Sequence, residues 1–213
     1  SLFDALNTAF ATAGTGGFGV LNDSMASYSP YIQWVVTVFM LLFSVNFSCY
    51  YLFLIGRFKD AFNSELRRFI CIVGAVILVI TLNVRGLFDT LGEALRHVAF
   101  TVASLISTTG FATENFDAWP ELSRTLLVLI MFIGACAGST GGGLKTTTFF
   151  AVCLIIRSQF SGKKHQAFHR KLPKDVTAKA LLLLLFALMV VIVATFFLCI
   201  FEPNTDFLDL LVE

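Results

Sequence analysis

Charged side chains are scarce in this chain. Only 14% of its 213 residues are charged, whereas a soluble domain carries about 25%. Hydrophobic residues make up 57%, among them 24 phenylalanines, and the mean hydropathy is +0.83. Long stretches contain no charge at all, which is the composition of a chain that lies in a lipid bilayer. The sequence therefore predicts a membrane protein.

Paired cysteines are also missing. The five cysteines are isolated, no C-x-x-C pair occurs, and most lie within apolar runs. This pattern disfavours a disulfide framework or a zinc site and favours cysteines that pack as small hydrophobic side chains. The sequence also offers no recognisable catalytic acid–base pair and no nucleophile with a partner. We therefore expect no enzymatic activity, no cofactor in this chain, and no structural metal site.

Four segments are apolar enough to cross a bilayer, which takes about 20 helical residues. They are residues 31–56, 69–84 (with a possible extension to 66–88), 122–156 and 180–201. Two further segments, 1–13 and 88–107, are helix-like but too short and too polar to span. Each ends in a Thr/Gly turn and a polar return, as a re-entrant loop does where protein or water surrounds it. The predicted fold is an all-α membrane protein whose helices alternate with two re-entrant loops.

Basic residues cluster on one predicted side of the membrane. Residues 57–68 and 157–179 hold eleven of the fifteen basic residues and three of the fourteen acidic ones. By the positive-inside rule these segments are cytoplasmic, which places both Thr/Gly turns on the outside. The sequence leaves two interpretations of the outer acidic residues open: solvated loop charges, or a vestibule that concentrates cations.

The first Thr/Gly turn also matches a nucleotide-binding pattern. Gly14, Gly16 and Gly19 in "TAGTGGFGVLND" spell G-x-G-x-x-G. That fingerprint needs a preceding strand, whereas a helix-like segment precedes it here. Moreover, "TGGFGVLN" (15–22) recurs as "TTGFATEN" (108–115), and the counterparts of Gly14 and Gly19 are not glycine. The repetition argues against a nucleotide site and indicates a fold of duplicated units.

A potassium filter explains the repeated turn better. A dehydrated potassium ion needs oxygen ligands, and rings of backbone carbonyls supply them. Glycine permits the backbone angles, threonine adds oxygens at the inner end, and the aromatic ring supports the turn from behind. Glycine at the third position of both turns favours potassium over sodium. The predicted ion-binding residues are Thr15, Gly16, Gly17 and Phe18, and Thr108, Thr109, Gly110 and Phe111.

Five stretches carry a resemblance to a known family: "TGGF" (15–18), "NFSCYY" (46–51), "NSELRRF" (63–69), "STTGFATENFDAWP" (107–120) and "GACAGSTGGGLK" (134–145). Together they resemble the TrkH/TrkG/KtrB superfamily of potassium transporters, and most of all its TrkH members. The resemblance implies four helix–pore-loop–helix repeats around one pore, of which this chain would be an internal fragment.

The same resemblance implies how the fragment divides. The second repeat would contribute its pore helix, filter loop and last helix (1–56), followed by a cytoplasmic link (57–68). The third repeat (69–156) would have a re-entrant filter loop and a broken last helix. A basic cytoplasmic loop (157–179) would lead to the first helix of the fourth repeat and the start of its pore helix (180–213).

A second glycine-rich stretch interrupts the third span. From Gly138 it reads G-S-T-G-G-G-L-K-T, which misses the spacing of a phosphate-binding loop by one residue. A small-residue helix contact is another interpretation, although three consecutive glycines break a helix. The resemblance implies an intramembrane gating loop below the filter, where Lys145 lies near the ion path or caps helix-end carbonyls. The predicted gating residues are Gly138, Ser139, Thr140, Gly141, Gly142, Gly143 and Lys145.

Several other polar residues lie in or beside the apolar segments. Our interpretation is that Ser44, Asn46, Ser48 and Asn83 bond other helices rather than line a watery cavity. We expect His97 to serve packing or the surface rather than bind an ion. His165 and His169 are spaced i, i+4 in the basic loop but lack a clear third ligand, so a solvated loop is favoured there.

The resemblance further implies potassium uptake through a homodimer in a bacterial inner membrane. A cytosolic TrkA-like regulatory subunit that binds NAD or ATP would gate it, and the basic loop 157–179 can contact that subunit or anionic lipid. No nucleic-acid partner is expected. The sequence leaves open whether transport is a symport with protons or sodium. Alternative functions are a nucleotide-binding membrane enzyme, a relative permeable to sodium and potassium, and a structural membrane fragment that does not transport.

Overall fold

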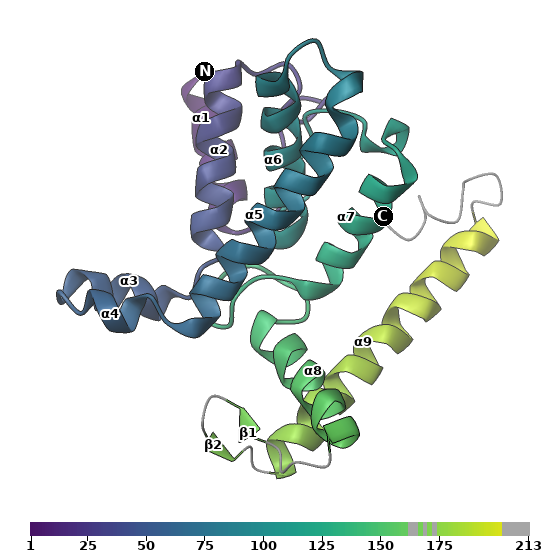
Figure 1. The fold of residues 1–213 in the computed structure, drawn as a ribbon. Coiled ribbons are helices and arrows are strands. Elements are labelled where there is room, and N and C mark those ends of the chain that lie inside the picture. Colours follow the sequence, from purple (N-terminus) through teal and green to yellow (C-terminus); the bar gives the residue numbers. More distant parts are fainter. Residues whose placement is uncertain (162–165, 168–169, 172–173, 202–213) are drawn as a thin grey trace. The chain divides into compact units, whose positions relative to one another are not determined.

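The computed structural model describes residues 1–161, 166–167, 170–171 and 174–201 (Figure 1). It divides into two compact units, Ser1–Lys145 and Thr146–Glu213. The division falls inside the predicted third repeat (69–156), directly after the glycine-rich stretch 134–145. Both Thr/Gly turns and the whole glycine-rich stretch therefore belong to the first unit.

The first unit is helical, as predicted. Its elements are α1 (Leu2–Ala13), α2 (Pro30–Phe43), α3 (Phe47–Leu54), α4 (Phe58–Ala61), α5 (Ser64–Val84), the 3-10 turn η1 (Arg85–Leu87), α6 (Leu91–Ser107), the 3-10 turn η2 (Phe116–Ala118) and α7 (Glu121–Ile133). Polar side chains mark several helix starts, because each accepts a hydrogen bond from a free amide of the first turn. Ser29, Asn63 and Thr90 do so for α2, α5 and α6.

Helix α6 lies at the centre of the first unit, packed against α2, α5 and α7 (Figure 1). Eleven of its 17 residues are buried. Its Val98, Val102 and Ile106 belong to an apolar cluster shared with α5 and α7, whereas its Phe100 and Ala103 belong to a second cluster shared with α2. Since the second Thr/Gly turn follows directly after α6, the packing of α6 fixes where that turn lies.

Two helical segments in the described part of the chain are long and apolar enough to cross a membrane, Ser64–Leu87 and Ala178–Phe201. They correspond to the predicted spans 66–88 and 180–201. The predicted span 31–56 is bent, because α2 and α3 meet at 92°. Asn46 starts α3 by accepting a hydrogen bond from the Ser48 amide at 2.8 Å. The polar residues of this segment therefore end one helix and begin another.

The second unit contains α8 (Thr146–Ser161) and α9 (Lys174–Phe201). Between them, β1 (Gln166–Ala167) pairs antiparallel with β2 (Arg170–Lys171). Within the described residues, these two short strands are the only elements that are not helical. They lie in the predicted basic loop. His165 and His169 lie outside the described residues.

Candidate functional site

The two predicted filter turns, residues 15–18 and 108–111, leave their helices in the same way. In each, one amide bonds the carbonyl five residues earlier and the preceding amide bonds the carbonyl three residues earlier, which is a Schellman helix end. The bonds are Gly16 N to Ala11 O (2.8 Å) and Thr15 N to Thr12 O (3.3 Å), and Thr109 N to Ser104 O (2.9 Å) and Thr108 N to Leu105 O (3.1 Å). The sequence repeat is therefore also a structural repeat.

Both turns begin with a threonine in the left-handed region. The φ angles are 50° at Thr15 and 57° at Thr108, followed by 68° at Gly17 and 85° at Gly110. A positive φ is usual for glycine but is an outlier for a β-branched residue. Glycine would end these helices at lower energy, so the threonines are not explained by local folding.

The two turns lie against each other. A Cβ added to Gly17 would overlap the carbonyl oxygen of Thr109, whereas nothing lies within 4 Å of a Cβ at Gly110. The 89 residues between the turns (19–107) are thus folded so that the main chains of the two turns meet. Only glycine at position 17 permits this approach.

The aromatic residues of the two turns differ. Phe111 is 3% exposed and packs with Met25, Met40 and Phe100, so it supports its turn from behind as expected. Phe18 is 78% exposed. The expected support from behind is therefore present at the second turn and not at the first within the described residues.

The glycine-rich loop, residues 134–145, contacts both turns. Thr15 Oγ1 donates to the Thr140 carbonyl at 3.2 Å, and the Gly142 amide donates to Thr108 Oγ1 at 2.6 Å. The loop therefore bonds both left-handed threonines. It accepts a hydrogen bond from Thr15 and donates one to Thr108. Lys145 donates from Nζ to the Gly141 carbonyl. Its ammonium thus bonds a carbonyl of the loop itself, whereas the expected partners were helix-end carbonyls.

Three glycines of the loop have either a positive φ or a close neighbour that leaves little room for a side chain. Gly138 (φ 71°) lies against the Asn46 side chain, and a Cβ at Gly141 would come within 3.0 Å of the Ser107 carbonyl. Gly143 also has a positive φ of 70°. Ser139 donates from Oγ to the Cys136 carbonyl at 2.6 Å. The glycines thus let the loop fit beneath the end of α6.

The same loop also docks on the break between α2 and α3. The Cys136 amide donates to the Ser44 carbonyl (3.0 Å), the Phe47 amide donates to the Gly138 carbonyl (3.0 Å), and the Thr140 amide donates to the Phe43 carbonyl (3.3 Å). Breaking α2 from α3 leaves these backbone groups without helical partners. The backbone groups freed at the break in the first span therefore form hydrogen bonds with those freed at the break in the third span.

Some interpretations of the polar residues need correction. Ser44 does not bond another helix through its side chain, because its Oγ donates to Met40 within α2, and Asn46 caps its own α3. Asn83 does reach another helix, since its Nδ2 donates to Ser123 Oγ of α7 at 2.8 Å. His97 is 7% exposed, which confirms a role in packing.

Sequence reasoning missed one contact of the loop. The Ala137 amide donates to Glu65 Oε1 at 2.9 Å, so a carboxylate in the first turn of α5 holds the loop. A carboxylate acceptor strengthens such a bond. The available signal was an acidic residue beside Arg67 and Arg68 in a mostly basic segment.

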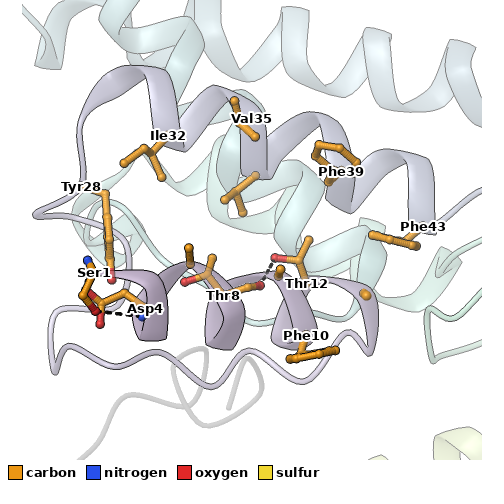
Figure 2. A pocket seen from close by; sticks show the side chains of 14 residues that line it. Ser1, Asp4, Thr8, Phe10, Thr12, Tyr28, Ile32, Val35, Phe39 and Phe43 are labelled. Atoms are coloured by element: carbon orange, nitrogen blue, oxygen red, sulfur yellow. Dashed lines mark hydrogen bonds and ion pairs between the residues drawn. The ribbon is translucent and has the colours of Figure 1, made fainter.

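A separate groove of about 550 Å³ lies between α1 and α2 (Figure 2). Its walls are mostly apolar side chains such as Ile32, Val35 and Phe39, with Asp4 at one end. No residue of the two turns or of the glycine-rich loop lines it. Such a surface suits hydrocarbon rather than a cation, so we assign it no part in the ion site.

Comparison with known proteins identifies cation transport proteins as similar to this chain. Residues 1–213 match the TrkH family model, whose description is cation transport protein. The Trk system potassium uptake protein TrkH of Salmonella typhimurium is 34% identical over 148 residues, which cover 67% of this chain and 31% of that protein. The Trk system potassium uptake protein TrkG of Escherichia coli is 32% identical over 173 residues, which cover 79% and 35%.

A solved structure is also similar. The crystal structure of the potassium transporter TrkH from Vibrio parahaemolyticus matches with a TM-score of 0.86 and 27% identity, over 99% of this chain and 48% of that chain. The match confirms the predicted fold class. The matched part of the chain spans about a third of the two uptake proteins and about half of the solved chain.

Proposed function

The chain belongs to the TrkH family of cation transport proteins, and on this premise we propose that its two turns form part of a potassium-selective filter in the full-length protein. The carbonyl groups of residues 15–17 and 108–110 would replace the water shell of a dehydrated potassium ion. The observation that carries the proposal is the contact between Gly17 and the Thr109 carbonyl, because it brings the two repeated turns to one place.

The helices that lead into the turns support a cation site. Helix α1 ends just before the first turn and α6 just before the second, so a carboxyl-terminal helix end lies beside each turn. Each such end carries the equivalent of about half a negative charge. A positive ion at the turns is therefore favoured and an anion is not. No strand precedes either glycine-rich stretch in the described part of the chain, which disfavours the nucleotide-binding alternative.

The glycine-rich loop would act as the gate of this filter. It bonds Thr15 and Thr108 at the inner end of both turns, and its glycines let the backbone rearrange at low steric cost. In the resting state the loop would obstruct the ion path, and on activation it would move aside. Deleting residues 138–143 in the full-length protein should raise potassium flux, whereas unchanged flux at normal expression would contradict a gating role.

Substitution of Gly110 tests the filter itself. Nothing lies within 4 Å of a Cβ at this position, so Gly110→Ser changes the turn without displacing a neighbour. We expect its strained φ of 85° to disturb the carbonyls and to lower the preference for rubidium over sodium in uptake assays. A wild-type preference would remove Gly110 from the filter. An equal wild-type flux of sodium and potassium would instead support the unselective alternative.

A titration separates transport from nucleotide chemistry. Calorimetry on the full-length protein with potassium, sodium and NAD should show binding of the alkali ion and none of NAD. The reverse result would favour the nucleotide-binding enzyme. Two further parts of the proposal are a homodimer in a bacterial inner membrane and a cytosolic nucleotide-binding regulator. The run of basic residues in 157–179 supports contact with that regulator or with anionic lipid.

A further inference from the structure

The chain returns from both turns as a paired structure. After the first turn, the Met25 amide donates to the Ala112 carbonyl at 2.9 Å, and the Ala112 amide donates to Ser24 Oγ at 3.1 Å. Ala112 directly follows the second turn. We call residues 24–26 and 112–113 the return limbs. Because they bond each other, a shift of one limb moves the other and both turns with it.

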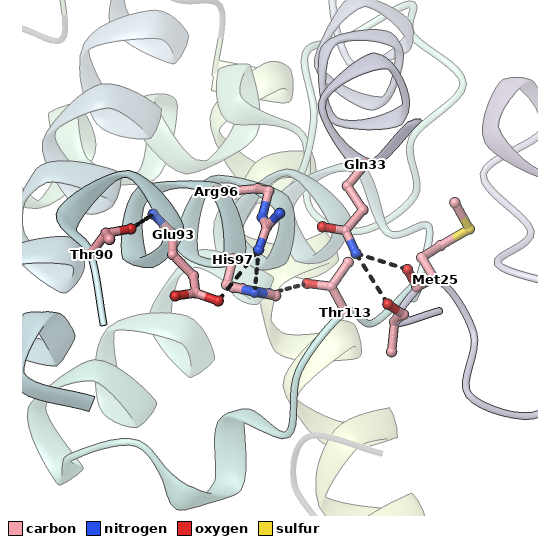
Figure 3. A network of polar contacts seen from close by, with 8 residues as sticks. Met25, Gln33, Thr90, Glu93, Arg96, His97 and Thr113 are labelled. Carbon is pink, nitrogen blue, oxygen red and sulfur yellow. Dashed lines mark hydrogen bonds and ion pairs between the residues drawn. The ribbon is translucent and has the colours of Figure 1, made fainter. Parts of the chain in front are cut away.

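Two buried side chains hold the return limbs from behind (Figure 3). Gln33 of α2 donates from Nε2 to the carbonyls of Met25 (3.0 Å) and Ala26 (3.4 Å). His97 of α6 bonds Thr113 through Nδ1 and Oγ1 at 3.0 Å. Each return limb is therefore fixed to a helix of the core by one side chain.

The surroundings of His97 determine which of its nitrogens carries the proton. Arg96 Nη2 lies 3.1 Å from Nε2, and arginine can only donate, so Nε2 must accept. The ring proton then sits on Nδ1 and is donated to Thr113. The Phe88 ring stacks on the imidazole at a centroid distance of 5.3 Å and an angle of 11°, which fixes the ring orientation.

We propose that neutral His97 is a positioning residue for the filter, and that its protonation from the outer side releases the second return limb and weakens ion selection. This inference rests on the proposed function of the two turns. His97 touches no predicted ion ligand, so it acts through Thr113 and Ala112. The outer position of the return limbs follows from the predicted topology.

A second proton on His97 would disrupt this arrangement. It would sit on Nε2, directly opposite the Arg96 guanidinium, so the hydrogen bond becomes a contact between two positive charges. The repulsion would displace the ring from Arg96, and the Nδ1–H group that holds Thr113 would move with it. Burial, and secondarily Arg96, lower the pKa of His97 from the usual value of 6.5, although Glu114 and Glu93 oppose this. The neutral form of His97 therefore persists at neutral pH, and it is lost only when the outer pH falls below the usual histidine pKa of 6.5.

The charged groups on the elements packed against α6 are few. Helix α2 has no charged residue, and the two charged residues of α7, Glu121 and Arg124, pair with each other at 3.7 Å. Helix α5 is charged only near its start, and Arg85 of η1 and Asp89 lie on either side of Phe88 in the sequence. On α6 itself, Glu93 lies 3.6 Å from Arg96. Those that act on His97 are Arg96 and Glu93 from its own helix and Glu114 from the segment after Thr113.

The test measures the rubidium-to-sodium flux ratio of the full-length protein in liposomes as the outer pH falls from about 7.5 to about 5. For the wild type we expect the ratio to fall on the order of tenfold, the effect of one lost hydrogen bond to a charged group. His97→Gln can donate to Thr113 and accept from Arg96 without titrating, so its ratio should stay high at every pH. His97→Ala should give a low ratio at every pH.

A matched control is His165→Gln, in the basic segment, which should keep the pH dependence of the wild type. If His97→Gln also keeps that dependence, the inference is overturned. If His97→Ala selects rubidium as well as the wild type does, the positioning role is overturned while the proposed filter stands. A wild-type protein without selectivity at any pH would instead overturn the proposed function.

Discussion

The amide of Gly142 donates a hydrogen bond to Oγ1 of Thr108 at 2.6 Å. It joins the glycine-rich loop to the first residue of the second turn, which holds a left-handed conformation that threonine seldom adopts. The strain of Thr108 and its bond to the loop belong together, because a glycine here would relieve the strain but could not accept from Gly142. The proposed gate is thus bonded to the proposed filter through the side chain of a residue with a strained backbone.

Removing this hydroxyl should loosen the gate. Thr108→Val keeps the β-branched shape and its strain but cannot accept from the Gly142 amide. A hydrogen bond of this kind is worth about 0.5–1.5 kcal/mol, so we expect basal rubidium uptake to rise roughly three- to tenfold. Thr108→Ser retains the hydroxyl and should behave like the wild type. Equal uptake by the valine and serine variants would show that the bond does not hold the gate.

The two filter glycines should differ in their tolerance of a methyl group. Gly17→Ala adds a Cβ where the Thr109 carbonyl lies, whereas Gly110→Ala meets only the strain of a positive φ, about 1–2 kcal/mol. We therefore expect Gly17→Ala to lower thermal stability in detergent and transport more strongly than Gly110→Ala. Gly74→Ala, in the middle of α5 with open space around it, should instead stabilise the protein by about 1 kcal/mol. Equal effects at positions 17 and 110 would contradict the contact between the turns.

The carboxylate that holds the loop gives a third prediction. Glu65→Ala removes the acceptor of the Ala137 amide, a bond to a charged group worth about 1.5–3 kcal/mol, and should raise basal rubidium uptake about tenfold or more. Glu65→Gln keeps an oxygen acceptor and should fall between this variant and the wild type. The control is Asp60→Ala, which breaks an exposed ion pair with Arg57 of little energetic weight. Uptake by Glu65→Ala at the level of Asp60→Ala would rule out an anchoring role.

Much of the architecture could be read from the sequence because periodicity and composition report it directly. The helices before both turns, the break at residues 134–145 and the apolar span 180–201 all rest on local signals, and each is present. The repeat at Thr15 and Thr108 even extends to the same helix-end hydrogen bonds.

The contacts between distant segments were beyond such reasoning. Ser44 and Asn46 looked like side chains that bond another helix, whereas the backbone that their break exposes pairs with residues 136–140. No pattern within either stretch specifies the other as its partner. The same limit explains why Glu65 was missed and why His97 was assigned to packing without its bond to Thr113. Local sequence shows that a backbone group needs a partner, and the fold decides which one it meets.

The central claim is that main-chain oxygens of the two turns replace the water around a potassium ion. The most direct test is anomalous diffraction from crystals of the full-length protein grown with rubidium. We predict an anomalous peak coordinated by carbonyl oxygens of residues 15–17 and 108–110. A map in which rubidium is bound elsewhere, with no peak between these two turns, would contradict the account.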